Sequence, residues 1–176
     1  TKLIVAVSGG VDSVVLLDAL SKTSNTDLVI AHFDHGIRDD SAKDATFVAE
    51  LAKKYNLPFE NKREELGKSV NKEKARIRRY KFLREIAKKY DAKLVTAQHS
   101  DDAIETIAIN LSRGTGWRGL AAMDSDIVRP LINMTKEEII SYAKRNNLSW
   151  REDSTNTSDY YLRNRLRRKL ENLDDD

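Results

Sequence analysis

The chain has 176 residues, of which 40% are hydrophobic, with only 2 prolines and 7 glycines. This composition suits one folded domain and excludes a disordered chain. The formal net charge is only +3 and there is no cysteine, which excludes disulfides, thiolate metal sites, iron–sulfur clusters and persulfide chemistry.

The apolar run nearest the start, residues 3–7, is much shorter than the roughly 20 residues of a membrane-spanning helix. A signal peptide needs a basic segment, an apolar segment and a cleavage site, and none of these precedes the glycines at positions 9 and 10. We therefore expect a cytoplasmic protein without a membrane partner.

The first half of the chain alternates between strand and helix patterns. Short apolar runs predict strands at residues 3–7, 28–33 and 57–59. Apolar residues at helical spacing predict two helices, one that carries Val14, Val15, Leu17 and Leu20, and one at residues 41–55.

The second half continues this alternation. It predicts helices at residues 70–90, 101–111 and about 159–170, a strand at 93–97 and an extended segment at 127–131. Thr135 and Glu138 fit a capping box that starts a further helix. The whole pattern indicates an α/β fold with a doubly wound, mostly parallel sheet, helices on both faces, and sites at the carboxyl ends of the strands. We expect residues 1–176 to form one such domain.

A glycine motif joins the first strand to the first helix, where residues 8–13 read SGGVDS. Two glycines let the backbone approach an anion, and the amino end of a helix offers N–H groups and a positive dipole. Because the Asp12 carboxylate would repel phosphate, we expect Mg²⁺ to bridge them. The alternative is a plain turn in which Asp12 complements the helix dipole. The motif lacks the lysine of a Walker loop.

A cluster of acids follows the fourth predicted strand. Asp102 and Glu105 share one helical face and lie close in sequence to Asp101 and His99. The acids either complement the helix dipole or bind a ligand such as an ammonium group or a second Mg²⁺. His99 is a candidate to take the proton from an attacking amine.

Other candidate site residues lie at the ends of predicted elements. His32 and His35 end the second strand, either as structural histidines or in a site, and Arg38 follows them. A G-x-G-x-x-G match at residues 114–119 follows a helix pattern and not a strand, so it does not indicate a dinucleotide site. Arg113, directly before the match, and Arg118, within it, either reach phosphate or are solvated.

Two basic runs are hidden by the small net charge. Seven of the thirteen residues at 72–84 are Lys or Arg, and the second run covers residues 163–169. Arg76, Arg79 and Tyr80 fall on one helical face that combines charge with a ring on which a base could pack. These runs either bind a polyanion such as RNA or form solvated faces.

The motif at residues 8–13 resembles the signature of the ATP-pyrophosphatase, or PP-loop, superfamily, whose members cleave ATP between its α and β phosphates. Further motifs resemble, in the same order, those of the amino-terminal catalytic domain of tRNA isoleucine lysidine synthetases. They lie at residues 32–38, 75–80, 96–106, 113–116, 129–131, 152–156 and 163–167. The match covers nearly the whole chain, with departures at Gln98, where the family often has histidine, and at Ala103, where it often has glutamine.

This resemblance implies a ligase that modifies tRNA. ATP with Mg²⁺ adenylates the C2 oxygen of the wobble cytidine in an isoleucine tRNA with a CAU anticodon, and the side-chain amine of free L-lysine then displaces AMP. Many members carry carboxyl-terminal tRNA-binding domains that this sequence does not include, so we expect either a minimal enzyme or a truncated one.

The resemblance and the patterns above together assign roles to individual residues. Asp12, His99 and Arg113 are expected to be catalytic, with Asp12 also the metal ligand. The residues expected to bind ATP are Ser8, Gly9, Gly10, Asp12, Ser13 and His32. Those expected to bind lysine are Asp101, Asp102 and Glu105. Those expected to bind tRNA are Arg38, Arg76, Arg79, Tyr80, Arg163, Arg165 and Arg167.

Of three alternatives, the first is excluded by the absence of cysteine and the other two stay open. The tRNA thiolation enzymes resemble the chain in the phosphate loop, but they depend on cysteines or iron–sulfur clusters. Amidotransferase-type synthetases share the loop but not the arginine motifs around Arg76 and Arg163. A non-catalytic ATP- or RNA-binding module is the third, and the acid cluster at residues 101–105 argues against it.

Overall fold

The computed structural model describes residues 1–23, 26–36, 41–65, 67, 72–100 and 126–152. Their strands form one parallel sheet in the order β3-β2-β1-β4-β5. The strands are β1 (Lys2–Ala6), β2 (Asp27–Asp34), β3 (Phe59–Arg63), β4 (Lys93–Val95) and β5 (Ile127–Val128). The chain winds outward from β1 to β3 and then crosses to β4 on the other side. Ligands of such sheets bind at the carboxyl ends of the strands where this reversal occurs, here between β1 and β4.

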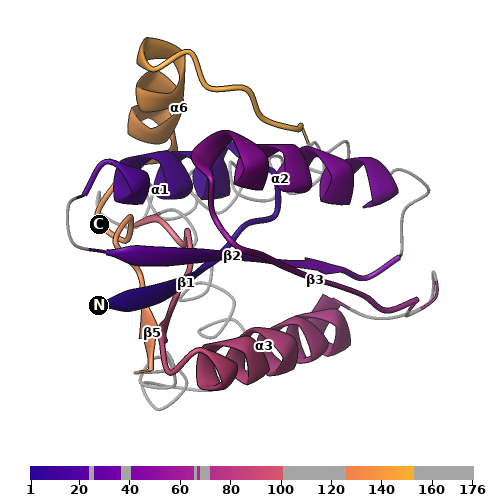
Figure 1. Ribbon diagram of the computed structural model, residues 1–176. Coiled ribbons are helices and arrows are strands. Elements are labelled where there is room, and N and C mark those ends of the chain that lie inside the picture. Colours follow the sequence, from indigo (N-terminus) through magenta and orange to yellow (C-terminus); the bar gives the residue numbers. More distant parts are fainter. Residues whose placement is uncertain (24–25, 37–40, 66, 68–71, 101–125, 153–176) are drawn as a thin grey trace, which may run out of the picture.

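Helices cover both faces of the sheet (Figure 1). α1 (Val11–Ser21) and α2 (Ser41–Tyr55) lie on one face, and α3 (Lys72–Lys89) lies on the other. α6 (Lys136–Arg145) packs against α1. This arrangement confirms the doubly wound parallel sheet expected from the sequence. Within the described ranges, no helix is both long and apolar enough to cross a membrane.

Two predicted strands needed correction. The third strand covers residues 59–63 and not 57–59, because Leu57 N–H donates to Ala52 O at 2.9 Å and closes the end of α2. The strand then runs along an edge of the sheet, where polar side chains face solvent. The extended segment expected at 127–131 ends at residue 128, because Pro130, which lacks an N–H to pair in a sheet, begins a turn.

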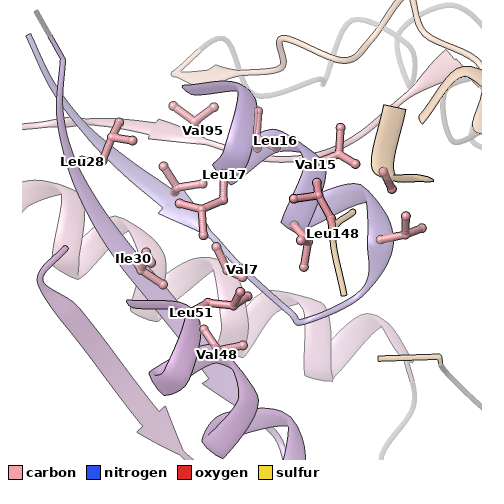
Figure 2. Packing of buried hydrophobic residues seen from close by; sticks show 14 of the residues in the cluster. Val7, Val15, Leu16, Leu17, Leu28, Ile30, Val48, Leu51, Val95 and Leu148 are labelled. Carbon is pink, nitrogen blue, oxygen red and sulfur yellow. The ribbon is translucent and has the colours of Figure 1, made fainter. Parts of the chain in front are cut away.

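The apolar core has one cluster on each face of the sheet. The larger cluster lies between the sheet and α1, α2 and α6 (Figure 2), and the smaller one lies under α3. Four successive residues of α1, Val14 to Leu17, are each at most 1% exposed. α1 is therefore buried around most of its circumference, because the sheet covers one side of it and α6 covers another. This burial holds the amino end of α1 in place where the strand order reverses, between β1 and β4.

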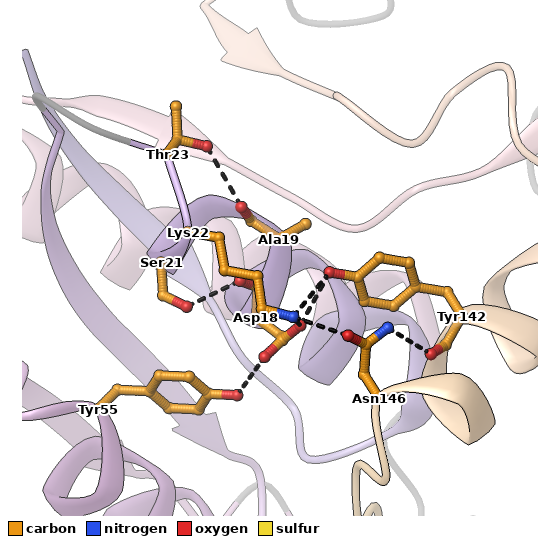
Figure 3. Close-up of polar contacts among 8 residues, drawn as sticks. All are labelled: Asp18, Ala19, Ser21, Lys22, Thr23, Tyr55, Tyr142 and Asn146. Atoms are coloured by element: carbon orange, nitrogen blue, oxygen red, sulfur yellow. Dashed lines mark hydrogen bonds and ion pairs between the residues drawn. The ribbon is translucent and has the colours of Figure 1, made fainter.

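A buried carboxylate joins three helices at the other end of α1 (Figure 3). Asp18 accepts hydrogen bonds from Tyr55 of α2 at 2.9 Å, from Tyr142 of α6 at 2.8 Å and from Lys22 at 2.6 Å. Lys22 also donates to Asn146 Oδ1, beyond α6, at 2.8 Å. Burial raises the pKa of Asp18, but the hydrogen bonds from Lys22, Tyr142 and Tyr55 outweigh it, so the net pKa is lowered. This network holds α6 on α1.

Candidate functional site

A cavity of about 340 Å³ opens at the carboxyl ends of β1, β2 and β4. It lies where the order of the strands reverses, as expected for a ligand site in this fold. Four of the residues expected to bind ATP line it: Ser8, Asp12, Ser13 and His32. The other two, Gly9 and Gly10, lie between them in the loop that joins β1 to α1. The structure therefore brings the residues that were predicted to bind ATP to one place.

The loop forms a cradle of N–H groups around one hydroxyl. Ser13 Oγ accepts from the N–H of Ser8 and from the N–H of Gly9, both at 3.2 Å, and donates to Gly10 O at 2.9 Å. A bound anion would have to displace the Ser13 hydroxyl to accept from the same two donors. Two convergent backbone N–H groups at the amino end of a helix are a typical phosphate-binding arrangement.

The backbone of the cradle requires glycine at position 9. Gly9 has φ of +95°, a backbone conformation that L side chains rarely adopt. The segment after α6 supports the same residue, because the N–H of Arg151 donates to Gly9 O at 2.9 Å. The Arg151 side chain in turn pairs with Asp44, whose Oδ1 is 2.8 Å from Nε. No local pattern singled out Arg151, because it lies 142 positions beyond Gly9 along the chain.

Asp12, the expected metal ligand, borders the cavity with a side chain that is 29% exposed. Lys136 Nζ donates to its Oδ1 at 2.5 Å, and His99 Nε2 lies 3.8 Å from the same oxygen. Lys136 is the first residue of α6, directly after the N-cap Thr135, which forms a capping box with Glu138. The sequence pattern predicted this helix start but not the contact of Lys136 with Asp12. The loop lacks a Walker lysine, and Lys136 brings an ammonium group to it from α6.

His99 lies deeper than the sequence suggested. Its side chain is 2% exposed, and it is not among the residues that line the cavity. A base that takes a proton from an amine must reach that amine, so this role stays a prediction. The position of His99 next to Asp12 also suits a residue that positions the Asp12 carboxylate.

The residues on the face of α3 that was expected to bind RNA border two different sites, the cavity and a groove on α3. Arg79 and Tyr80 line the cavity, and Tyr80 also borders a groove along α3 together with Arg76. The Tyr80 ring is only 7% exposed, and the guanidinium groups of Arg76, Arg79 and Arg84 lie 5.5, 5.4 and 5.9 Å from its centre. The groove therefore offers cationic groups, while most of the ring is covered. RNA binding by these residues stays a prediction.

Several predicted site residues lie outside the described residues. They are Arg38, the lysine-site acids Asp101, Asp102 and Glu105, the catalytic candidate Arg113 with its neighbour Arg118, and the tRNA-binding candidates Arg163, Arg165 and Arg167. The helices predicted at 101–111 and 159–170 and the glycine loop at 114–119 lie outside them as well.

The profile of the PP-loop domain family matches residues 1–173. The chain belongs to this family. The phosphate cradle at Ser8 to Ser13 is thus the PP-loop itself, and ATP is the ligand that the loop of this family binds.

Curated relatives of this PP-loop domain carry the name tRNA(Ile)-lysidine synthase. The protein from Haemophilus ducreyi is 39% identical over 176 residues, which cover 96% of this chain and 41% of that protein. The protein from Thermotoga maritima is 37% identical over 182 residues, which cover 96% of this chain and 44% of that protein. The chain thus spans about two fifths of the length of these relatives.

Solved structures show the same fold at lower identity. The U34-tRNA thiolase NcsA from Methanococcus maripaludis, solved with its [4Fe-4S] cluster, has a TM-score of 0.79 at 17% identity. The similarity covers 99% of this chain and 66% of that one. An NH3-dependent NAD synthetase from Campylobacter jejuni has a TM-score of 0.57, also at 17% identity, over 84% of this chain and 64% of that one. Likeness at this level shows a shared fold.

The residues present fit ATP with Mg²⁺. The cradle supplies N–H groups for phosphate, and the partly exposed Asp12 carboxylate borders the same cavity. Mg²⁺ is commonly held by one or two carboxylates together with phosphate oxygens and water. Asp12 therefore suits a metal ion whose other ligands are mainly phosphate oxygens of the nucleotide and water.

Proposed function

We propose that this PP-loop domain catalyses the formation of lysidine in tRNA. The observation that carries the proposal is the 39% and 37% identity over 96% of this chain to proteins named tRNA(Ile)-lysidine synthase. The cavity and its phosphate cradle supply the site that ATP needs. The substrates are ATP, free L-lysine and an isoleucine tRNA whose CAU anticodon contains the wobble cytidine.

The first step is adenylation. The C2 oxygen of cytidine attacks the α-phosphorus of ATP, a C2–O–P linkage forms, and the bond to the β-phosphate breaks to release pyrophosphate. The N–H groups of Ser8 and Gly9 hold phosphate oxygens, and the Lys136 ammonium offsets charge on the leaving pyrophosphate. Asp12 would hold Mg²⁺, which supplies further positive charge beside the phosphates.

The second step is attack by lysine. Its side-chain amine forms a bond to C2, the C2–O bond breaks, AMP leaves with the oxygen, and the amine loses a proton. We propose His99 as the group that takes this proton or that positions Asp12 for the first step. Asp101, Asp102 and Glu105 are proposed to bind the ammonium groups of lysine, and Arg113 is proposed as a further catalytic residue.

Product analysis tests the proposal. With Mg²⁺, ATP, bulk tRNA and labelled amino acids supplied one at a time, we expect label to remain in RNA only with lysine. Chromatography of the nucleotides should show AMP, and pyrophosphate should form in equal amount, because the bond between the α and β phosphates breaks. ADP as the main product would refute adenylation, and retention of another amino acid would refute lysidine formation.

RNA binding by α3 predicts a specific dependence on salt. Reversing the charges of Arg76 and Arg79 should make the slope of log affinity for tRNA against log salt shallower by about one to two, since each lost phosphate contact removes about 0.7 to 0.9. Filter binding or fluorescence anisotropy between low and moderate salt measures this slope.

A matched control reverses two lysines on the opposite face of the sheet. Lys53 and Lys54 are exposed in the last turn of α2, so their reversal changes the net charge equally and should leave the slope closer to that of the wild type. Equal slopes for both double variants would mean that the α3 arginines form a solvated face.

A further inference from the structure

Three buried polar groups around the cavity lack a hydrogen-bond partner. They are His32 Nε2, Ser41 Oγ and Thr96 Oγ1, and among the described residues none supplies a partner for any of them. Their residues are 4%, 4% and 6% exposed, and all three line the same cavity. A buried polar group without a partner costs about 1 to 3 kcal/mol, so three around one cavity point to a ligand that completes them.

The three groups approach the cavity from different elements. His32 belongs to β2, Ser41 is the first residue of α2, and Thr96 directly follows β4. The cradle for phosphate occupies a fourth side, between β1 and α1. A nucleotide whose phosphates lie on the cradle must place its nucleoside in the remaining space, where these three side chains lie.

The hydrogen bond on the other ring nitrogen determines what His32 can recognise. Nδ1 lies 2.8 Å from Val7 O, and a carbonyl oxygen can only accept, so Nδ1 carries a proton. In the neutral ring, Nε2 then has a lone pair and can only accept. The hydroxyls of Ser41 and Thr96 can donate or accept. His32 is therefore the selective member of the group, because it requires a donor on the ligand.

We infer that His32 is the residue that recognises the nucleoside half of ATP, with Ser41 and Thr96 as adaptable partners. Nε2 accepts from a hydrogen-bond donor of adenosine, which is either the exocyclic amine of adenine or a ribose hydroxyl. This inference rests on the proposed use of ATP in this cavity. It adds a specificity role to the phosphate contacts of the loop.

Paired variants separate recognition from folding. In His32→Asn, the amide nitrogen can take the place of Nδ1 and keep the bond to Val7 O, but nothing replaces Nε2. In His32→Gln, the amide reaches the place of Nε2 and the bond to Val7 O is lost. We expect His32→Asn to weaken binding of ATP with Mg²⁺ about tenfold with little change in Tm. His32→Gln should keep more of the affinity and have a lower Tm.

Ligand analogues identify the recognised group. Calorimetry without tRNA would compare ATP with purine riboside triphosphate, which lacks the amine, and with 2′-deoxy-ATP and 3′-deoxy-ATP. The wild type should lose about tenfold in affinity for the analogue that lacks the recognised donor, and His32→Asn should bind that analogue and ATP equally. Thr96→Val and Ser41→Ala should each weaken ATP binding by a smaller factor. Thr46→Val, on the exposed side of α2, is the matched control and should have no effect.

The outcomes separate this inference from the proposed function. If the wild type binds ATP, and His32→Asn has the same Kd for ATP and the same ratios among analogues, the three groups are satisfied by water and the inference is wrong. If His32→Asn raises the KM for lysine and leaves the Kd for ATP unchanged, the groups serve the amino acid and the inference is also wrong. If the wild type binds no ATP at all, the proposed function fails and the inference fails with it.

Discussion

Asp12→Asn is expected to lower the rate of tRNA adenylation by about two orders of magnitude or more, the loss typical when a central charge-stabilising group is removed. The amide keeps the size of the carboxylate but not its charge, so it holds Mg²⁺ weakly beside the phosphates. Asp12 lies in the first turn of α1 with a side chain that is 29% exposed, so Tm should change by only a few degrees. Pyrophosphate release in the presence of tRNA and Mg²⁺ measures the rate.

Lys136→Met is the matched comparison for this variant. It removes the ammonium that lies 2.5 Å from Asp12 Oδ1 and leaves the carboxylate free to hold the metal. We expect the rate to fall less than in Asp12→Asn, and we expect Lys136→Arg to recover part of it. If Asp12→Asn has the wild-type rate, Asp12 only complements the helix dipole. If Lys136→Met has the wild-type rate, Lys136 only holds Asp12 in place.

Asp18→Ala is expected to lower the free energy of unfolding by about 3 kcal/mol, because it removes one partner from a buried, charge-assisted network. Asp18 is 5% exposed and accepts from Tyr55, Tyr142 and Lys22 on three sides. The loss removes the acceptor of the Tyr55 and Tyr142 hydroxyls, while Lys22 keeps its hydrogen bond to Asn146 Oδ1. Urea denaturation at neutral pH, followed by circular dichroism, measures the change.

The same network predicts how this difference depends on pH. The pKa of Asp18 is below its ordinary value of 3.8 in the folded chain, so its contribution is complete above that value and is lost as the pH falls through the folded pKa. The stability of the wild type and of Asp18→Ala should therefore converge in acid. Lys22→Met, which removes a half-exposed partner, should cost much less stability than Asp18→Ala, because solvent screens an exposed ammonium. A constant gap between wild type and Asp18→Ala down to pH 2 would show that the lost contacts were apolar.

Local pattern was enough to predict most of the elements among the described residues. The apolar periodicity of α2 predicted Ser41–Tyr55 to the residue, and Thr135 with Glu138 predicted the start of α6 through a capping box that the structure contains. The predictions failed where tertiary position overrode local composition. The edge strand β3 is polar because one side faces solvent, and its apolar lead residue, Leu57, instead closes the end of α2.

The sequence by itself also determined the chemistry of the phosphate loop, because the glycines, the hydroxyls and the carboxylate of residues 8–13 are neighbours along the chain. Only the tertiary structure decided which distant groups meet that loop. Lys136 is 124 positions from Asp12, and His32, Ser41 and Thr96 come from separate elements. They meet because parallel strands end at one edge of the sheet, and the network at Asp18 holds α6 on α1. Side-chain proximity of this kind depends on strand order and helix packing, which no local pattern specifies.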